Sequence, residues 1–558
     1  MSHVAELSRH NAARRGERLR GVLERLVFGS AVYRMLLLGS VPTRLLLSPP
    51  AGHGDAQRGA AILRGELALA GERCAAADLW AVPASEAWQA AAHAFEWLAD
   101  LRAEDSPAAR ERAQALIESW IRQHGDWSPL PWRGDVLGRR LVMWLAEHEF
   151  FAAGAGEDFT ALFMRSLARQ ARHLDRVARL GGAALGPPGY GRIGALVALV
   201  HAAACLPGGK DRLPRALVLM LREVDRQVLP DGGHYQRSPT VQLAVLRELV
   251  GLRRVLIAGR HTVPSGLQGA IDRMAPLLRF FRHGDGRLAL FNGTNEGSAA
   301  EIDGVLGLTD AAGKPPASAP HTGFQRMETG RALVIADTGP PAPVESDGYA
   351  HAGTLSFELS YGKERLVVNC GARPHARGEW LVAQRATAAH STLALADANS
   401  SEVLPSGQLG RRPRHVLCRR DEEEGAMLVD ASHDGYAPPF GVLHRRRLYL
   451  PAEGEDLRGE DRLVRVRPGE PLPFAVRFHL HPDVKVSLVH DGKAALVRLA
   501  SGAGFRFDAA GGRLALEESI YLGAEAGARR TEQIVVASTL AGEEALVKWS
   551  FKRLGGEG

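Results

Sequence analysis

The chain has 558 residues, and 45% of them are hydrophobic, so it is too long for one ordinary core and we expect two domains. The formal net charge is only +6, which gives no reason to expect nucleic acid and suits either an acidic ligand or a general arginine-rich composition. Four widely spaced cysteines without a CxxC pair suggest neither a zinc knuckle nor a disulfide framework, so we expect a reducing compartment.

The N-terminal part combines an arginine cluster at residues 14–20 with an apolar run at residues 26–47. Arg34 interrupts this run and no convincing cleavage site follows it, so we predict neither a membrane span nor a signal peptide. The expected location is cytoplasmic or peripheral to the inner membrane, with the periplasm as an alternative. The segment either packs on the helical domain as an arm or forms an amphipathic helix that contacts a membrane.

Residues 85–310 are predicted to form helical hairpins, preceded by an arm and first helices over residues 1–84. Apolar residues recur there every three or four positions, which is typical of helices with one buried face. Helix starts are indicated at Ser106 and Ser238, each followed by proline, and Asp135 is a further candidate cap.

The character of the chain changes after His283. Residues 284–293 (GDGRLALFNG) are predicted to be turn and strand, and residues 311–320 (AAGKPPASAP) form a linker by composition. Many short strands separated by Gly, Pro and Asp follow over residues 321–558. We therefore expect an α+β multidomain protein, with an all-helical domain followed by an antiparallel β-sandwich.

Two histidines come together around a predicted hairpin. Polar and apolar residues alternate through residues 354–360, and a turn at Tyr361-Gly362-Lys363 leads into a return strand that ends at Asn369. His351 precedes this hairpin and His390 follows it. This arrangement is typical of a site built on neighbouring strands.

Four segments carry a resemblance to a known family: DGGHYQRSP (231–239), AHAGTLSFELS (350–360), LVVNCG (366–371) and RATAAHSTL (385–393). With helices before strands, they resemble the heparinase II/III family of polysaccharide lyases, which includes enzymes acting on heparin and alginate. The resemblance implies an incomplete (α/α) toroid followed by a β-sandwich. It also implies cleavage of an acidic, uronate-containing polysaccharide or oligosaccharide by β-elimination, in which a base removes a proton and an acid protonates the leaving oxygen.

The resemblance implies a metal site at His351, Asn369 and His390, with zinc as the expected ion. Asn369 stands where family members carry Asp, and its neutral oxygen attracts zinc less strongly. The alternative is that the two histidines are buried and tie strands together through hydrogen bonds. Tyr349 occupies a position two residues before the first metal histidine, where the family often has a catalytic group, so it is a candidate acid or base.

On the helical side, the connection before Ser238 offers His234 and Tyr235 as catalytic candidates and Gln236 and Arg237 as substrate-binding candidates. The following helix N-terminus has unpaired amides that favour a sugar carboxylate. The alternative is a capped turn whose polar groups satisfy one another.

Several positions depart from the family pattern. Gln236 stands in place of a common Glu, and Thr240 and Val241 stand where a Tyr is expected. Family members also carry an Asn or His in the preceding helical connection, and here Tyr190 is the nearest residue that could take this catalytic role. The remaining substrate-binding candidates are Arg192, Trp127, Trp132 and Arg385. The two tryptophans are included because sugar rings stack on such side chains. The alternative is that the tryptophans only pack between helices.

The favoured interpretation is a polysaccharide lyase, and the alternative is a non-catalytic glycan-binding or envelope polysaccharide-assembly protein on the same fold. A third interpretation, a membrane-surface protein, depends on the N-terminal segment. No dinucleotide, Walker, HExxH or GxSxG motif is present, so we expect no organic cofactor. The sequence does not indicate an oligomeric state.

Overall fold

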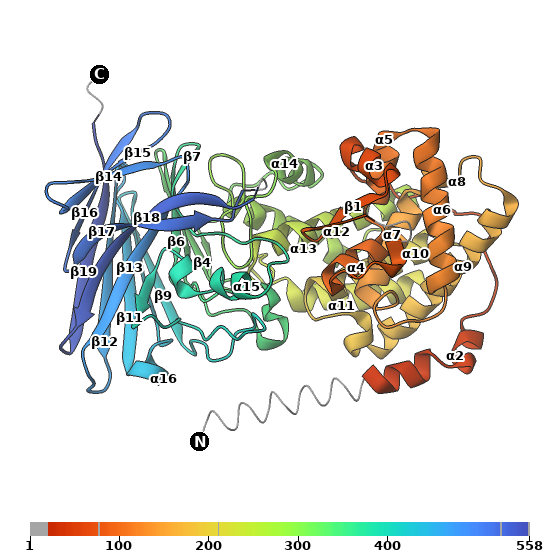
Figure 1. Ribbon diagram of the computed structural model, residues 1–558, viewed down its shortest axis with the longest axis horizontal. Coiled ribbons are helices and arrows are strands. Elements are labelled where there is room, and N and C mark those ends of the chain that lie inside the picture. The colour runs from red at the N-terminus through yellow and green to blue at the C-terminus, as the bar shows by residue number, and fades with distance from the viewer. Residues whose placement is uncertain (1–20, 76–78, 210, 525–526, 556–558) are drawn as a thin grey trace. The chain divides into compact units, whose positions relative to one another are not determined.

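The computed structural model describes residues 21–75, 79–209, 211–524 and 527–555, and it divides into two compact units. The helical unit comprises Met1–Val224 and Gly251–Leu267, and the sandwich unit comprises Asp225–Val250 and Gln268–Gly558 (Figure 1). The units therefore do not coincide with the sequence domains expected at residues 85–310 and 321–558, because the segment around residues 225–250 belongs with the strands. No helix in these described ranges is long and apolar enough to cross a membrane.

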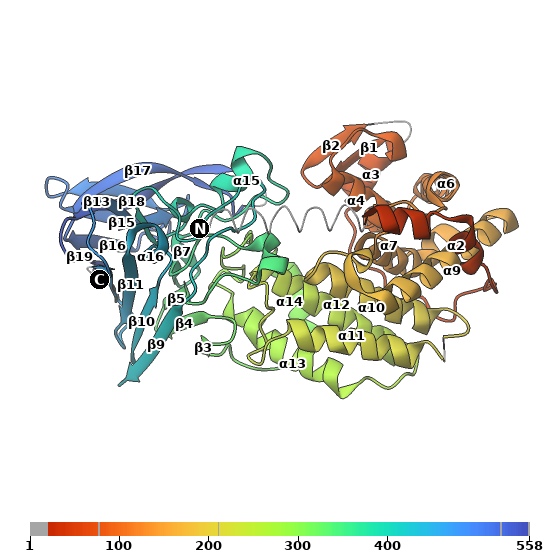
Figure 2. The same cartoon turned by 90° about the horizontal axis from the view of Figure 1, so that it is seen from below.

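The helical unit is built from the helices that the apolar periodicity predicts. Residues 21–28 are also helical, and a small antiparallel hairpin of β1 (Glu66–Leu69) and β2 (Glu72–Ala75) packs by α3 (Figure 2). The helices of this unit are α2 (Ala31–Leu36), α3 (Ala56–Leu63), α4 (Glu86–Ala94), α5 (Leu98–Glu104), α6 (Pro107–His124), α7 (Gly134–Ala146), α8 (His148–Ala152), α9 (Glu157–Leu180), α10 (Tyr190–Cys205) and most of α11 (Leu213–Gln227).

Helix α6 begins as predicted, because the Ser106 hydroxyl accepts a hydrogen bond from the Ala109 amide at 3.1 Å and proline fills the first helical position. The prediction that Asp135 caps α7 is wrong. That helix begins at Gly134, and Asp135 lies inside its first turn, where it accepts a hydrogen bond from Arg133 at 2.7 Å.

Three helices pass from one unit into the other: the last residues of α11 belong to the sandwich unit, and α12 (Pro239–Ala258) and α13 (Ser265–Phe280) are divided between the two units. The sandwich unit also contains the shorter helices α14 (Ala299–Gly307), α15 (Glu379–Ala383) and α16 (Ala437–Phe440). The strand expected within residues 284–293 is wrong. That stretch is an irregular segment with a single bridge between Arg282 and Leu288. Its polar side chains contact other parts of the unit: Asp285 accepts from Arg365, and Asn292 donates to the carbonyl of Arg237.

The strands form two antiparallel sheets, as predicted for a sandwich. The eight-stranded sheet contains β14 (Lys485–Val489), β15 (Ala494–Arg498), β16 (Gly504–Ala510), β19 (Glu544–Arg553), β12 (Asp456–Arg465), β11 (Val442–Leu450), β10 (Ala426–His433) and β9 (Val416–Glu423), in that order. The nine-stranded sheet contains β17 (Arg513–Tyr521), β18 (Arg529–Leu540), β13 (Leu472–Leu480), β7 (Glu364–Val368), β6 (Phe357–Tyr361), β5 (Ala332–Asp337), β4 (Phe324–Thr329) and β3 (Ser318–Ala319), and β8 (Leu393–Leu395) also pairs with β13.

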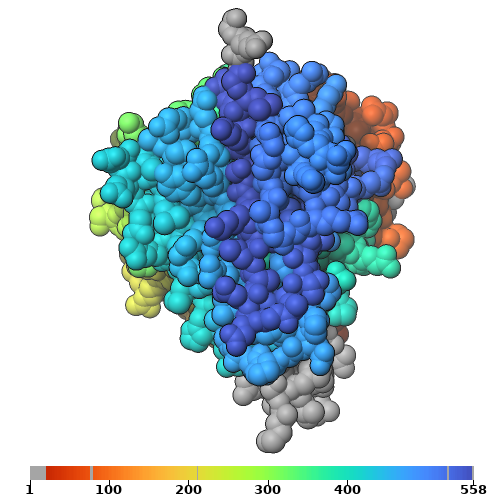
Figure 3. All heavy atoms as spheres, turned by 90° about the vertical axis from the view of Figure 1, so that its left-hand side faces the viewer, coloured from red at the N-terminus to blue at the C-terminus, as the bar shows by residue number. Residues whose placement is uncertain are grey.

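The core of the sandwich lies between the two sheets. Strand β11 shows this clearly, because its residues alternate strictly between buried and half-buried. Phe357 of β6 stacks on Trp549 of β19 with ring centroids 5.3 Å apart, which joins the two sheets. The opposite side of the eight-stranded sheet forms a face of the molecule, with β19 running through its middle (Figure 3).

The predicted hairpin is confirmed by β6 and β7, which are antiparallel and joined at Gly362. The backbone at Gly362 is left-handed (φ +61°), the conformation that glycine adopts without strain. His351, Asn369 and His390 are all buried close to this hairpin.

Candidate functional site

The connection between α11 and α12 folds back on itself through a bridge between Val228 and His234. The side chain of His234 is buried, and both ring nitrogens have partners. Nδ1 accepts a hydrogen bond from the Gln236 amide at 3.3 Å, so Nε2 carries the proton and donates to Gln227 Oε1 at 2.8 Å. Burial lowers the pKa of His234 to about 3, so the ring is neutral and held within the protein.

Arg237 is also enclosed by protein groups. Its guanidinium donates to the carbonyls of Thr322 and Pro340, each at 2.6 Å, and to Asp337 Oδ1 at 2.5 Å. It lies over the ring of Phe324, 4.7 Å from the centroid. Arg237 therefore joins the helical connection to the strands, and its N–H groups are engaged by those strands.

The start of α12 is occupied in a similar way. The amide of Thr240 donates to Thr294 Oγ1 at 3.3 Å, and the hydroxyls of Ser238 and Thr294 are 3.1 Å apart. Asn292, two residues before Thr294, donates to the carbonyl of Arg237 at 3.0 Å. The segment containing Asn292 and Thr294 thus covers the helix N-terminus at which we expected a sugar carboxylate to bind.

His351 and His390 are paired directly, which confirms that the sequence brings them into one neighbourhood. His390 Nδ1 donates to the Ala386 carbonyl at 2.8 Å, so its Nε2 is an acceptor and takes a hydrogen bond from His351 Nδ1 at 3.1 Å. His351 Nε2 is buried and has no hydrogen-bond partner among the residues that the structure describes. Burial lowers the pKa of both rings, to about 4 for His390 and well below the ordinary value for His351.

Asn369 lies beside this pair, but its side chain serves the backbone. The side-chain Oδ1 accepts from the Ser391 amide at 3.0 Å, and the backbone amide of Asn369 donates to Glu358 Oε1 at 2.8 Å. Across the described ranges, the structure places no group of three or more His, Cys, Asp or Glu side chains to hold a metal. Because His390 Nε2 and Asn369 Oδ1 already accept hydrogen bonds, the three residues as arranged do not fit a divalent ion, and zinc binding stays a prediction.

Behind Asn369 lies a buried, hydrogen-bonded pair, Glu358 and His283, that the sequence did not single out. Burial lowers the pKa of His283. Glu358 Oε2 accepts from His283 Nε2 at 2.9 Å and from the Leu290 amide at 3.1 Å. His283 Nδ1 in turn contacts the hydroxyl of Ser360 at 2.9 Å. The signal was a polar row on β6, because Ser356, Glu358 and Ser360 share one side of the strand and all are fully buried.

Tyr349 is half-buried at the end of a short helical turn before His351. It packs on Gly293, where an added Cβ would come within 3.1 Å of the tyrosine ring. Arg385 holds the loop that contains Tyr349 by donating hydrogen bonds to the carbonyls of Gly348 and Gly407. Tyr235 is half-buried as well, with its ring edge-on to His234 and its hydroxyl buried. Tyr190 is also half-buried, so the three predicted catalytic tyrosines keep some exposed surface and His234 does not.

The other candidates belong to the helical unit. Trp132 is buried, donates to the His124 carbonyl at 2.9 Å and packs edge-on against His173. Trp127 is half-buried and contacts Phe28, with centroids 5.8 Å apart. Tyr190 opens α10, and Arg192 donates to the Gly186 carbonyl at 3.4 Å. Trp132 thus fits the packing alternative.

We expect acid to destabilise the protein through its buried neutral histidines. The unfolded His234 titrates at about pH 6.5, well above its folded pKa, so the unfolded state binds more protons as the pH falls below that value. This histidine alone costs about 2 kcal/mol between about pH 8 and pH 5. Denaturant unfolding at both pH values should show a smaller pH effect for His234→Gln, whereas exposed His321→Gln should match the parent; equal pH effects in all three proteins would contradict this.

Comparison with known proteins defines the class. Residues 311–550 match the family model described as heparinase II/III-like, C-terminal. Crystal structures share the fold: Heparinase III at TM-score 0.72 and 12% identity, covering 94% of this chain and 89% of that one, and a heparan sulfate lyase HepC mutant from Pedobacter heparinus at TM-score 0.63 and 14% identity, covering 90% and 83%. The fold is an (α/α) toroid with a β-sandwich, as expected.

The chain belongs to the heparinase II/III-like family. A relative along the whole length is FtsZ-localized protein C of Caulobacter vibrioides (strain NA1000 / CB15N). It is 33% identical over 562 residues, which cover 96% of this chain and 95% of the relative.

Proposed function

We propose that this protein is a non-catalytic member of its family and acts as a binding protein at the site of cell division. The observation that carries this proposal is that three residues predicted to act on the substrate or to bind a metal, His234, Arg237 and His390, are held by other protein groups. His234 has both ring nitrogens engaged, His390 is fixed between His351 and a carbonyl, and Arg237 is committed to strand carbonyls and Asp337.

β-Elimination requires a base that reaches the substrate proton and donors aimed at the developing negative charge. The amide of Thr240 at the start of α12 is such a donor, and Thr294 occupies it. A neutral, buried His234 is a poor acid and has no lone pair left to act as a base. The arrangement therefore favours binding over turnover.

The division site is suggested by the relative that is named FtsZ-localized and aligns over 96% of this chain. We expect a fluorescent fusion of this protein to concentrate at midcell together with FtsZ, and to disperse when FtsZ is depleted. A fusion that stays uniformly distributed in dividing cells would contradict a role at that site.

Lyase activity is tested directly by incubating the purified protein with a panel of uronate polysaccharides and following the ultraviolet absorbance of the unsaturated product. We expect no rise, while an active heparinase run alongside gives one, and calorimetry reports binding of any acidic glycan. A substrate-dependent rise that Tyr349→Phe abolishes would show that the protein is a lyase.

That second function, a uronate lyase, is favoured by one specific feature. His351 Nε2 is an acceptor without a partner, and Tyr349, two residues earlier, keeps part of its surface exposed. A substrate proton or hydroxyl would satisfy the buried nitrogen, so the absorbance test decides between the two functions.

A membrane contact fits the N-terminal segment. Its helices are held on the helical unit by Tyr33, whose hydroxyl is 2.7 Å from His173 Nδ1, and by Arg172 and Arg176, which donate to the carbonyls of Leu37 and Leu36. Phe28 and Leu37 are buried, but many other apolar side chains of the segment are exposed: Val22, Leu23, Leu26, Val27, Val32, Met35, Leu36, Leu38, Val41 and Leu46. Together with the exposed Arg25 and Arg44, such a surface suits anionic lipid. The arginine cluster at residues 14–20 lies outside the described residues.

We expect the protein to co-sediment with vesicles that contain anionic lipid, and the double variant Leu23→Glu/Leu26→Glu to bind at least about tenfold more weakly, because burying two leucines contributes a few kcal/mol. The matched control is Leu180→Glu, which replaces an exposed leucine at the end of α9. Equal loss in the control, or no binding by the parent, would contradict the contact.

A further inference from the structure

A cavity lies in the sandwich unit, lined by residues other than those of the candidate site. It has a volume of about 390 Å³, and its charged lining comes from segments that are distant in sequence. Arg287 follows α13, Lys363 lies in the β6–β7 turn, His481 directly follows β13, and Arg529 begins β18. Convergence of basic side chains from four segments is a feature that the proposed function does not use.

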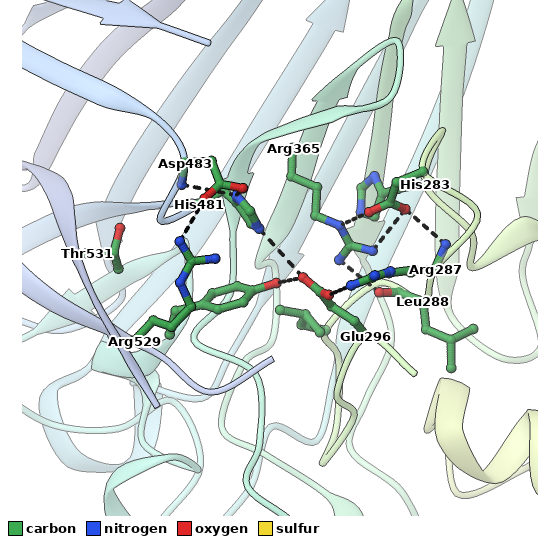
Figure 4. A network of polar contacts seen from close by, with 12 residues as sticks. His283, Arg287, Leu288, Glu296, Arg365, His481, Asp483, Arg529 and Thr531 are labelled. Atoms are coloured by element: carbon green, nitrogen blue, oxygen red, sulfur yellow. Dashed lines mark hydrogen bonds and ion pairs between the residues drawn. The ribbon is translucent and has the colours of Figure 1, made fainter. Parts of the chain in front are cut away.

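The floor of the cavity consists of carboxylates that are already satisfied. Glu296 Oε2 accepts from Arg287 at 2.5 Å, Oε1 accepts from the Tyr521 hydroxyl, and His481 Nε2 lies 3.6 Å away (Figure 4). Asp285 receives two hydrogen bonds from the buried Arg365, at 2.8 and 3.2 Å. Asp285 is therefore neutralised by a buried arginine, whereas Glu296 pairs with the half-exposed Arg287 and accepts a hydrogen bond from Tyr521.

The cations at the rim are committed much less firmly. Arg529 is 44% exposed and makes one ion pair through Nη2, with Asp483, which is 57% exposed. Arg287 is 50% exposed and engages Glu296 through Nη1 alone. A guanidinium carries five N–H donors, and an exposed ion pair contributes little to stability, so both arginines have donors left for a ligand.

Lys363 is exposed at the same rim and forms no ion pair within the described residues. Val484, Leu499 and Ala524 supply an apolar wall. The carboxylate of Glu364 also lines the cavity, and it accepts a hydrogen bond from the Ser501 amide at 2.8 Å. A charged rim beside an apolar wall suits a small molecule with one anionic group and a compact body. The volume lies within the range of small-molecule sites, which begins at roughly 300 Å³.

We propose that this cavity binds the oxyanion of a small acidic molecule between Arg529, Lys363 and Arg287. A carboxylate, sulfate or phosphate group takes the place that Asp483 holds beside Arg529, and the body of the ligand rests on the apolar wall. The arginine fork matches such planar or tetrahedral oxyanions, which is why the ligand is an acid and not a neutral sugar.

Calorimetry on the full chain tests this with inorganic phosphate, sulfate and D-glucuronate, using D-glucose and sodium chloride at matched ionic strength as references. We expect saturable binding of at least one acid, and the acid bound most tightly identifies the source of the oxyanion. Arg529→Ala and Lys363→Ala should each weaken it about tenfold, the loss expected for one charged hydrogen bond.

Arg530→Ala is the matched control, because Arg530 is the next residue, is 83% exposed and pairs with Glu518 at the surface. It should bind like the parent, and unliganded melting temperatures verify that all variants fold. If no acid binds more than chloride does, or if Arg529→Ala and Arg530→Ala bind alike, the proposal is overturned. The result does not depend on turnover, so it stands apart from the test of the proposed function.

Discussion

Replacing Asp461 by alanine is expected to lower the free energy of unfolding by about 3–5 kcal/mol, the range for breaking a buried ion pair by removing one partner. Asp461 lies on β12 inside the sandwich and is fully buried. It receives two hydrogen bonds from Arg446, at 2.8 and 3.0 Å, and one each from His444 and Trp549, both at 2.8 Å. Burial opposes its ionisation, but Arg446 and His444 hold its pKa well below the ordinary range.

Without Asp461, the buried Arg446 charge has no carboxylate partner within this network. Chemical denaturation followed by tryptophan fluorescence and circular dichroism measures the loss. The control is Asp421→Ala on β9 of the same sheet, where Asp421 is 44% exposed and pairs with an exposed Arg419. The control should change stability by no more than about 0.5 kcal/mol. A loss below about 1 kcal/mol for Asp461→Ala would mean that the network can relax around the missing carboxylate.

Arg237→Met is expected to destabilise the sandwich unit by a similar amount, about 3–5 kcal/mol, because it leaves Asp337 buried without a counter-charge. Burial raises the pKa of Asp337 even with Arg237 present, so the loss of stability should grow with rising pH, as the unpaired carboxylate is forced to ionise. The measurement is denaturant unfolding at about pH 6 and pH 8.

This prediction separates two roles for Arg237. A residue that served only to bind substrate would leave the free energy of unfolding unchanged when replaced. The control is Arg247→Met, which removes an exposed arginine that pairs with Glu301 at the surface, and it should have little effect at either pH. Adding Asp337→Asn to Arg237→Met should recover part of the loss, because no unpaired charge then remains buried.

The sequence predicted the order of helices and strands because burial imposes a period on apolar residues in both. The predictions fail where the apolar period continues although the backbone leaves the helical conformation. The apolar pattern continues from α4 into α5, yet Phe95 adopts a left-handed conformation (φ +61°) and divides them. Nothing in the local sequence marks this break, since neither glycine nor proline stands there.

The candidate site was predicted as a neighbourhood but not as a set of contacts. Strand alternation located His351 and Asn369, and their meeting with His390 is confirmed. The groups that engage the site, Thr294 and Gln227, lie far along the chain from the residues they contact or belong to another element. Local sequence patterns do not show which distant amide or hydroxyl will pair with a given polar group. From the sequence alone we therefore expected these groups to be free to bind a substrate.

The passage of α12 and α13 from one compact unit to the other has a practical consequence for dissecting the molecule. The family match begins at residue 311, but the unit that contains those strands also includes Asp225–Val250 and the chain from Gln268 onward. A fragment cut at the family boundary would lose Arg237 and Asp231, which hold Asp337 and Thr322. The stretch that the family model recognises as a domain is therefore shorter than the stretch needed to keep the contacts of the sandwich unit.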